Sequence, residues 1–283
     1  MIVVTGATGQ LGRLVIQSLL TKLPAAQIVA AVRQPERAAD LAELGVQVRQ
    51  ADYTKPATLD AAFKGAEKIL LISSSEVGQR TAQHKNVIDA AKRAGVSLLA
   101  YTSLLHADRS PLGLAAEHQA TEALLQESGV PHVLLRNGWY TENYLASIPP
   151  ALQHGAYIGS AGEGRIASAA RADYAEAAAA VLTQAGQAGK VYELAGDESY
   201  TLAEFAAELS KQAGQSIPYV NLPEADFKAA LVGAGLPEPL AGLLADSDIG
   251  AANGGLFDDQ RQLSHLIGRP TTALAVLIKA ALH

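Results

Sequence analysis

The sequence lacks cysteine, basic clusters and long apolar runs. Without cysteine, the 283-residue chain can form no disulfide, thiolate metal site or thiol nucleophile. Asp and Glu (28) outnumber Lys and Arg (22), which argues against a nucleic-acid partner. No apolar stretch approaches the roughly 20 residues that cross a bilayer, and the N-terminus has no basic signal-peptide region. We therefore expect a cytoplasmic protein with neither a nucleic-acid nor a membrane partner.

Motifs of several enzyme classes are also missing. The seven histidines show no His-x-x-x-His or His-Glu-x-x-His spacing, so no metal site is expected. The sequence contains neither a Gly-x-Ser-x-Gly elbow nor a Gly-x-x-x-x-Gly-Lys-Ser/Thr loop. Hydrolase and kinase functions therefore lose their main support.

A short apolar strand at residues 2–5 runs directly into three glycines spaced three apart. Gly6 permits a sharp turn, Gly9 permits close approach of the backbone to a diphosphate, and Gly12 permits tight packing of the following helix. The first interval is one residue longer than in Gly-x-Gly-x-x-Gly, but the strand before and the helix after supply the required context. The pattern predicts dinucleotide contacts from the whole turn: Gly6, Ala7, Thr8, Gly9, Gln10, Leu11 and Gly12.

Strand-length apolar runs alternate with helical patterns through the first half of the chain. The strands are expected at 2–5, 28–33, 46–50, 69–72, 98–102 and 133–136. Helices are expected at 10–18, 35–44, 56–64, 79–94 and 114–128, and Gly45, Gly65, Gly95 and Gly129 follow four of them as left-handed caps. This alternation predicts an α/β protein with a doubly wound parallel sheet of Rossmann type.

The second half is expected to form a smaller C-terminal α/β lobe on the substrate side. Helices are predicted near 170–184, 202–214 and 225–233, with a strand at 191–195. The expected division is a dinucleotide-binding domain at 1–138 and a substrate-binding lobe mainly at 139–283, with later residues returning to the sheet. The sequence leaves the oligomeric state open.

Arg33 ends the second predicted strand, where an acidic residue would favour NAD. Its guanidinium suits a 2′-phosphate, so NADPH is predicted, with Arg13 as a possible second positive charge. Asp52 and Tyr53 follow the third strand and are expected near the adenine end. Beside the middle of the cofactor we expect three serines that follow the fourth strand: Ser73, Ser74 and Ser75.

Several segments together resemble the NmrA-like, atypical branch of the short-chain dehydrogenase/reductases. They are Thr5-Gly-Ala-Thr-Gly-Gln-Leu-Gly12, Arg33, Ser73-Ser-Ser-Glu-Val-Gly-Gln79, Tyr101-Thr-Ser-Leu-Leu-His-Ala-Asp108 and Leu134-Leu-Arg-Asn-Gly-Trp-Tyr-Thr-Glu-Asn143. Within this branch the chain is similar, nearly end to end, to bacterial NADPH-dependent quinone oxidoreductases and to triphenylmethane dye reductases. The resemblance implies a Rossmann-type domain, NADPH, and two-electron reduction of a small-molecule quinone.

One departure from the wider superfamily narrows the chemistry. No tyrosine has a lysine four positions later, and Leu114 and His118 stand where that pair would fall. Reduction of a ketone develops an alkoxide, whose conjugate acid has a pKa of about 15.7, whereas a quinone develops a phenolate with a pKa of about 10. The difference corresponds to roughly 8 kcal/mol, so a quinone, or a cationic dye carbon, needs little help from an acid.

The segment 137–143 is the expected nicotinamide end of the site. Its predicted cofactor contacts are Asn137, Gly138, Trp139, Tyr140, Thr141 and Glu142, with Arg165 from a glycine-rich loop. The residues expected nearest the reaction are His118, Tyr140 and Asn143, of which His118 is a possible proton donor. An equally good interpretation is that His118 is a helix residue with no role in the reaction.

Two functions remain open at this stage. The first is an NADPH-dependent quinone reductase that transfers hydride directly, without flavin, with cationic dyes as alternative acceptors. The second is a redox-sensing regulator of NmrA type that binds the dinucleotide and a protein partner without turnover. An open space beside the nicotinamide would favour the reductase, because a sensor needs none.

Overall fold

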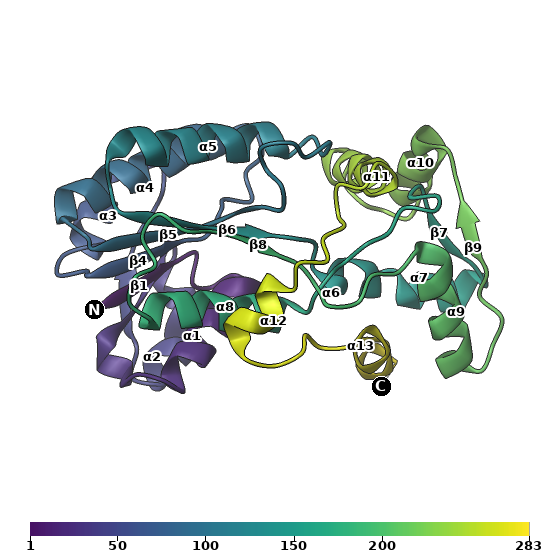
Figure 1. Ribbon diagram of the computed structural model, residues 1–283, viewed down its shortest axis with the longest axis horizontal. Helices are drawn as coiled ribbons and strands as arrows, with labels where there is room; N and C mark the ends of the chain where they lie inside the picture. The colour runs from purple at the N-terminus through teal and green to yellow at the C-terminus, as the bar shows by residue number, and fades with distance from the viewer. Residues whose placement is uncertain (283) are drawn as a thin grey trace.

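The computed structural model describes residues 1–282 and contains a seven-stranded parallel sheet (Figure 1). The strand order is β3-β2-β1-β4-β5-β6-β8, and every adjacent pair is parallel. The strands are β1 (Ile2–Thr5), β2 (Ile28–Val32), β3 (Gln47–Gln50), β4 (Lys68–Leu71), β5 (Leu98–Leu104), β6 (His132–Asn137) and β8 (Val191–Leu194). The predicted doubly wound fold is confirmed, and the strand order reverses between β1 and β4.

Helices cover both faces of this sheet (Figure 1). One face carries α3 (Pro56–Ala62), α4 (Arg80–Ala94) and α5 (Ala115–Ser128). The other carries α1 (Gln10–Leu20), α2 (Ala39–Glu43), α8 (Arg171–Thr183) and α12 (Gln262–Ile267). Alternate strand residues enter separate cores, as Val3 and Val4 do, and both are fully buried. Burial on both faces explains why the central strands are apolar throughout.

The predicted glycine caps have the expected backbone geometry. Gly95 and Gly129 end α4 and α5 in the left-handed conformation, with φ of 66° and 70°. Gly45 and Gly65 also have positive φ, at 83° and 74°. These positions end the helices and let the chain turn into the next strand.

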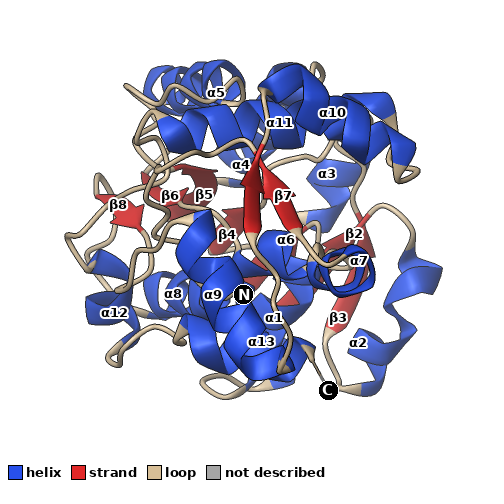
Figure 2. Cartoon of the chain, turned by 90° about the vertical axis from the view of Figure 1, so that its right-hand side faces the viewer, coloured by secondary structure: helices blue, strands red, loops and turns tan. Residues whose placement is uncertain are grey.

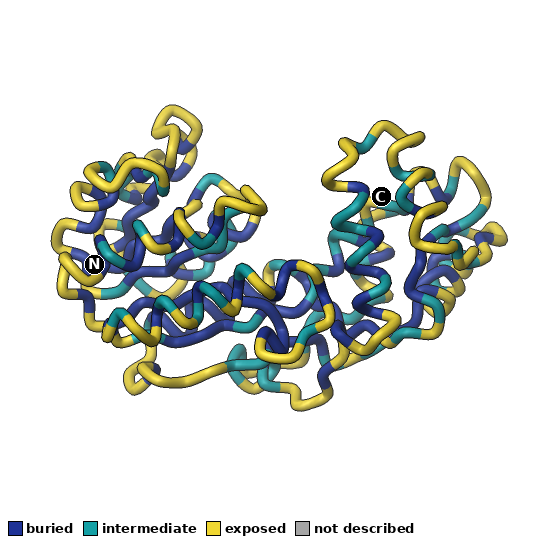
Figure 3. Tube along the Cα trace, turned by 90° about the horizontal axis from the view of Figure 1, so that it is seen from above, coloured by how far each residue is buried: buried dark blue, intermediate teal, exposed yellow. Residues whose placement is uncertain are grey.

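A second lobe adjoins the carboxyl ends of the strands. Its two short strands, β7 (Tyr157–Gly159) and β9 (Tyr219–Asn221), pair in parallel and lie among helices in the end-on view (Figure 2). The surrounding helices are α6 (Thr141–Leu145), α7 (Ile148–His154), α9 (Leu202–Ala213), α10 (Glu224–Gly233), α11 (Glu238–Ala252) and α13 (Leu274–Ala281). Buried backbone runs from the sheet into this lobe (Figure 3), which is centred on an aromatic core that includes Tyr144, Tyr157 and Phe205.

Several elements of the second half return to the sheet. Helix α8 packs against α1, β8 extends the sheet beside β6, and α12 packs on α8. The helices predicted near 170–184, 202–214 and 225–233 and the strand near 191–195 are present as α8, α9, α10 and β8. The division of the chain at residue 138 stays a prediction. Within the described residues, no helix is both long and apolar enough to span a bilayer.

Candidate functional site

The loops after β1 and β4 border a cavity of about 380 Å³ at the point where the strand order reverses. We call it the cofactor cavity. The predicted residues among those that line it are Gly6, Thr8, Gly9, Arg33, Asp52, Tyr53, Ser73, Ser74 and Ser75. The others are Arg37, Ala51, Thr54, Ile72, Glu76 and Gln83. This is the place where open α/β sheets bind dinucleotides.

The glycine turn has the geometry that its sequence predicts. Gly6 has a φ of +59°, and its carbonyl accepts the Gly9 N–H at 2.9 Å. A Cβ on Gly12 would lie 2.5 Å from the Gly6 oxygen and 2.7 Å from Ala7 Cα, so only glycine fits there. No side chain caps the N-terminus of α1, which leaves its amides available to an anion. Within the predicted motif, Ala7 and Leu11 are buried supports and Gln10 is exposed.

Two arginines, Arg33 and Arg37, lie in the wall of the cofactor cavity. Arg33 Nη1 forms an ion pair with Glu76 Oε1 at 2.7 Å. Arg37 also lines the cavity and was not predicted. Arg13 is instead paired with Asp40, and it donates to the Arg37 carbonyl at 2.9 Å. Arg13 therefore supports the backbone that carries Arg37 and is not itself a lining residue.

Asp52 and Tyr53 have different roles in the wall of the cavity. Asp52 Oδ1 accepts the Thr54 N–H at 2.9 Å and thereby orders the turn after β3. The Tyr53 hydroxyl donates to the Ile72 carbonyl at 2.9 Å and contacts Thr5 Oγ1. Burial raises the pKa of Tyr53, so it stays protonated. Its hydroxyl thus joins the ends of β1 and β4 beneath the glycine turn.

The serine loop rests on a buried polar network. The Ser73 N–H donates to Thr102 Oγ1 and the Ser74 N–H donates to His84 Nε2, both at 2.9 Å. Arg80 Nε donates to the Ser74 carbonyl at 2.6 Å. Burial, followed by the nearby Arg80 charge, lowers the pKa of His84 to about 3, so Nε2 is a neutral acceptor at physiological pH. The loop is therefore held by side chains from α4 and β5.

His118 belongs to the same network. Its side chain is buried, with Nδ1 2.7 Å from the Tyr101 hydroxyl and Nε2 3.4 Å from Arg80 Nη1. Burial, and then the Arg80 charge, lower the pKa of His118 to about 3. It contacts the α4 and α5 face of the sheet, whereas Tyr140 packs on the opposite face. The structure therefore does not bring His118 together with Tyr140 and Asn143, and its role as a proton donor stays a prediction.

In the segment 137–143, which was predicted to lie at the nicotinamide, some residues are hydrogen-bonded within the fold and others are not. Gly138 donates to the Leu194 carbonyl at 2.7 Å, and Thr141 Oγ1 lies 2.7 Å from Ser168 Oγ. Glu142 accepts the Arg171 N–H at 2.9 Å, at the start of α8. These three are used within the fold. Of the remaining residues, Asn137 has an unpartnered oxygen, and Trp139 and Asn143 line a cavity. Asn143 Oδ1 also accepts a long hydrogen bond, of 3.5 Å, from Arg171 Nη2.

Asn137 and Tyr140 form a buried polar corner. Asn137 Oδ1 is buried and has no hydrogen-bond partner. The Arg171 guanidinium lies 4.6 Å from the centre of the Tyr140 ring, and Tyr174 packs edge-on against that ring at 5.3 Å. Burial raises the pKa of Tyr140, while a hydrogen bond from Asn137 opposes the rise. The ring is fixed, and the Asn137 oxygen remains free to accept a donor.

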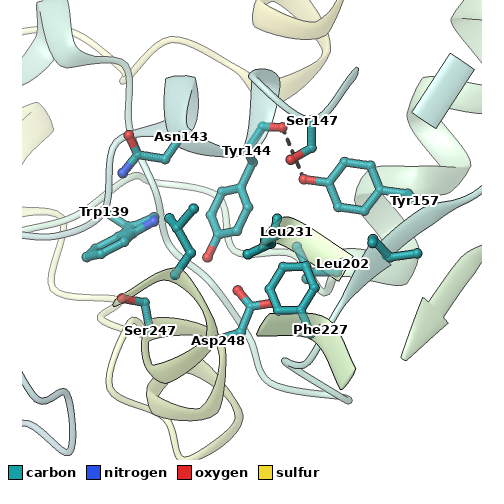
Figure 4. Close-up of a pocket in the computed structure, with 12 residues that line it drawn as sticks. Trp139, Asn143, Tyr144, Ser147, Tyr157, Leu202, Phe227, Leu231, Ser247 and Asp248 are labelled. Carbon is teal, nitrogen blue, oxygen red and sulfur yellow. Dashed lines mark hydrogen bonds between the residues drawn. The ribbon is translucent and has the colours of Figure 1, made fainter. Parts of the chain in front are cut away.

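Trp139 and Asn143 also line a second, smaller cavity in the C-terminal lobe (Figure 4). We call it the lobe cavity, and its volume is about 40 Å³. Its wall is mainly aromatic and aliphatic, with a buried carboxylate, Asp248, whose Oδ2 accepts the Ser160 N–H at 2.8 Å. Burial raises the pKa of Asp248 to about 6, and the Ser160 hydrogen bond only partly offsets it. The expected segment thus borders a small cavity.

Arg165 lies away from the cofactor cavity. Its Nε donates to Ser199 Oγ at 2.9 Å, Nη2 donates to the Ser199 carbonyl, and Nη1 is 3.6 Å from Glu204 Oε2. These contacts tie the glycine-rich loop to the start of α9. The predicted cofactor contact of Arg165 therefore stays a prediction, and its observed partners lie within the lobe.

The comparisons with known proteins agree with this geometry. The chain belongs to the NAD(P)H-binding family, whose model matches residues 6–185. It is 64% identical over 275 residues to quinone oxidoreductase 2 of Escherichia coli K12. The match spans 97% of this chain and 96% of that protein. The structure of the Escherichia coli NADPH-dependent quinone oxidoreductase with NADPH matches at TM-score 0.98, with 62% identity and complete coverage of both chains. Citrobacter sp. triphenylmethane reductase with NADP(H) matches at TM-score 0.96 and 39% identity, covering 99% of this chain and 100% of that one.

The residues present fit NADPH. The Gly12 position excludes a side chain at the turn, the α1 amides are uncapped, and two arginines line the cofactor cavity. Asn137 does not line the cofactor cavity, but its unpartnered Oδ1 is an acceptor of the kind that a carboxamide N–H requires. The predicted cofactor and the predicted resemblance are confirmed.

Proposed function

We propose that this protein is an NADPH-dependent reductase that transfers two electrons directly to quinones. The observation that carries the proposal is the set of groups that one segment offers. The segment 137–143 supplies an unpartnered acceptor, Asn137 Oδ1, and through Trp139 and Asn143 it also lines an apolar space. The 64% identity to quinone oxidoreductase 2 supports a quinone as the acceptor class.

The cofactor would be held by backbone amides and by two charged side chains. The turn at Gly6 and Gly9 would bind the diphosphate through the α1 N-terminus, and Arg33 and Arg37 would bind the 2′-phosphate. Asn137 Oδ1 would accept the carboxamide N–H. When bound, NADPH supplies the hydride that the reaction requires. The task of the protein is then orientation and exclusion of water.

The chain needs no strong acid for this reaction. Leu114 and His118 replace the Tyr-x-x-x-Lys pair, and His118 is neutral and enclosed at physiological pH. A hydroquinone oxygen develops as a phenolate, with a pKa of about 10, so water or a modest donor can protonate it. The absence of that pair is therefore compatible with quinone reduction and unsuited to ketone reduction. We propose that the reaction requires no flavin.

The test is NADPH oxidation followed by its near-ultraviolet absorbance, with and without a small benzoquinone. Quinone-dependent loss of signal in flavin-free protein supports the proposal. Tight NADPH binding without quinone-dependent oxidation would favour the NmrA-type sensor. A cationic dye is the second acceptor to assay, because triphenylmethane reductase is 39% identical to this chain. The cytoplasmic location and the absence of nucleic-acid and membrane partners stay predictions, and the oligomeric state stays open.

A further inference from the structure

The lobe cavity contains two polar groups that the fold does not fully use. The Tyr144 hydroxyl is buried and has no hydrogen-bond partner, and the residue is only 6% exposed. It points into the lobe cavity toward the end of the wall formed by Ser247 and Asp248 (Figure 4). A native fold rarely leaves such a donor unpaired, because desolvation without a partner is unfavourable. The orphaned hydroxyl therefore indicates a missing hydrogen-bond acceptor.

Asp248 lines the same cavity, and only one of its two oxygens accepts a hydrogen bond from the described residues. Oδ2 accepts the Ser160 N–H at 2.8 Å, but no hydrogen bond occupies Oδ1 in the described structure. The carboxyl comes from α11, whereas Tyr144 comes from α6, so the two are brought together only by the folded lobe. The titratable groups facing Asp248 are tyrosines, namely Tyr144 on α6, Tyr157 on β7 and Tyr219 on β9. Burial raises the pKa of each tyrosine, so all three remain protonated and none is a counter-charge for Asp248.

We propose that the lobe cavity is the acceptor site and that Tyr144 and Asp248 together bind one carbonyl oxygen of a monocyclic quinone. Tyr144 donates through its hydroxyl, and Asp248 donates through its protonated carboxyl. The inference rests on the proposed function and deepens it by naming the residues that hold the acceptor. Trp139 and Asn143 line this cavity and belong to the segment that the proposed function sets beside the nicotinamide.

The size of the lobe cavity limits what can enter it. Its volume of about 40 Å³ is well below the roughly 150 Å³ of a cavity that binds benzene. Phe227 and Leu231 of α10 close one side, with Leu202 of α9 close by (Figure 4). A single ring therefore enters only when α10 moves outward, and a triaryl dye requires a larger movement. The site thus favours a small planar acceptor over a large one.

Trp139 provides a readout that does not depend on turnover. It is the single tryptophan of the chain and lines the lobe cavity. We would titrate the NADP⁺-loaded protein, which cannot reduce a quinone, with 1,4-benzoquinone and follow saturable quenching of Trp139. Tyr144→Phe is expected to raise the dissociation constant about tenfold, the loss of one hydrogen bond. Its melting temperature should be unchanged or higher, because the deleted hydroxyl has no partner in the fold.

Asp248→Asn tests the second donor. The amide oxygen of the substituted side chain can still accept the Ser160 N–H, and its NH₂ donates at every pH. The wild type should lose affinity about tenfold between about pH 5 and about pH 7 as Asp248 ionises, since its pKa is about 6. The variant should bind equally at both values, and at the higher pH more tightly than wild type. Titration of the cofactor phosphates affects wild type and variants equally, so it does not contribute to the difference between them.

Asp226→Asn is the matched control, because Asp226 lies in the same lobe and does not line the lobe cavity. It should leave the quenching curve unchanged. The inference is overturned if Tyr144→Phe and Asp248→Asn bind the quinone as wild type does at both pH values, even when the wild type turns quinone over. It is also overturned if quenching never saturates. If quenching saturates and is weakened by the two variants but NADPH is not oxidised, the proposed binding site is supported and the reductase function is refuted.

Discussion

Arg33 and Glu76 meet across the cofactor cavity, with Nη1 and Oε1 2.7 Å apart. Arg33 comes from the end of β2 and Glu76 from the loop after β4, so the ion pair joins the two sides of the dinucleotide crevice. Both side chains are substantially exposed, at 66% and 44%, and the pair contributes little to stability. Its importance is to cofactor choice, because a 2′-phosphate would compete with Glu76 for the same guanidinium.

Arg33→Ala should weaken NADPH binding about 10- to 100-fold and leave NADH binding almost unchanged, because only NADPH carries the 2′-phosphate. Calorimetric titration with each cofactor measures the preference. Arg93→Ala removes an exposed arginine paired with Asp60 and is the matched control. An unchanged NADPH preference in Arg33→Ala would refute the assignment.

Glu76→Gln should strengthen NADPH binding about threefold, because Arg33 no longer has a carboxylate partner. Gln83 Nε2 donates to Glu76 Oε2 at 2.7 Å, and the glutamine amide oxygen can retain that contact. The gain should exceed any gain for NADH and should shrink with added salt. An equal gain for both cofactors would show that Glu76 acts on the general charge of the crevice and not on Arg33.

Gly12→Ala should abolish dinucleotide binding, because its Cβ would lie 2.5 Å from the Gly6 oxygen and displace the turn. Gly242→Ala in α11 is the matched control, since its Cβ would meet only Lys228 Cε, at 3.7 Å. That control should keep full NADPH affinity and gain about 0.5–1 kcal/mol in unfolding free energy. Thermal melts with and without NADPH separate the two effects. NADPH stabilisation of Gly12→Ala equal to that of wild type would contradict the turn's role.

Acid should destabilise the fold through His84 and His118. Their pKa values are about 3 in the folded protein and about 6.5 in the unfolded chain. Between these values the unfolded chain binds more protons, so the histidine contribution falls as pH falls from about 6.5 toward 3. The contribution of Asp248 to the free energy of unfolding changes in the opposite direction. Because its pKa is raised in the folded protein, this contribution is present in acid and is lost as pH rises through about 6. With two histidines against one carboxyl, the net effect should be loss of stability in acid.

Urea unfolding at about pH 7.5 and about pH 5.5 measures this loss. His118→Gln should show a smaller drop in unfolding free energy between the two values than wild type. Exposed His154→Gln is the control and should show the wild-type drop. If the unfolding free energy of wild type and of His118→Gln drops equally between the two pH values, the buried network does not lower the pKa of His118. The same His118→Gln protein tests the proton-donor hypothesis, which fails if quinone turnover is intact.

The pH dependence of acceptor binding should distinguish quinones from cationic dyes. Protonated Asp248 donates to a carbonyl, whereas ionised Asp248 attracts a cation. Quinone affinity should therefore decline as pH rises through about 6, and the affinity of a cationic dye should increase. Parallel fluorescence titrations measure both trends, and trends of the same sign would rule out Asp248 as the cause.

The alternating half of the chain was predictable because its strands are buried on both faces and are apolar throughout, as β1 and β2 are. The cofactor turn and Arg33 were predictable because their spacing along one βαβ unit is local. Tyr144 and Asp248 were not, because α6 and α11 are far apart in sequence and neither residue belongs to a motif. Helix α11 was also missed, since Gly and Ala interrupt its apolar pattern, and β7 and β9 have only three residues each.

Within the segment 137–143, the sequence identified the region correctly but not the direction of each side chain. Gly138, Thr141 and Glu142 are bonded within the fold, whereas Asn137 has an unpartnered buried oxygen and Trp139 and Asn143 line the lobe cavity. A turn between strand and helix has no fixed period, so no pattern could separate these two sets.

The most direct test of the central claim is a stoichiometric reaction under anaerobic conditions. Flavin-free protein is mixed with NADPH and 1,4-benzoquinone, and both cofactor and hydroquinone are quantified. We predict one NADPH consumed for each hydroquinone formed, with no semiquinone signal and with much slower reaction when NADH replaces NADPH. NADPH that binds but is not consumed, or consumption that requires added flavin, would contradict the account.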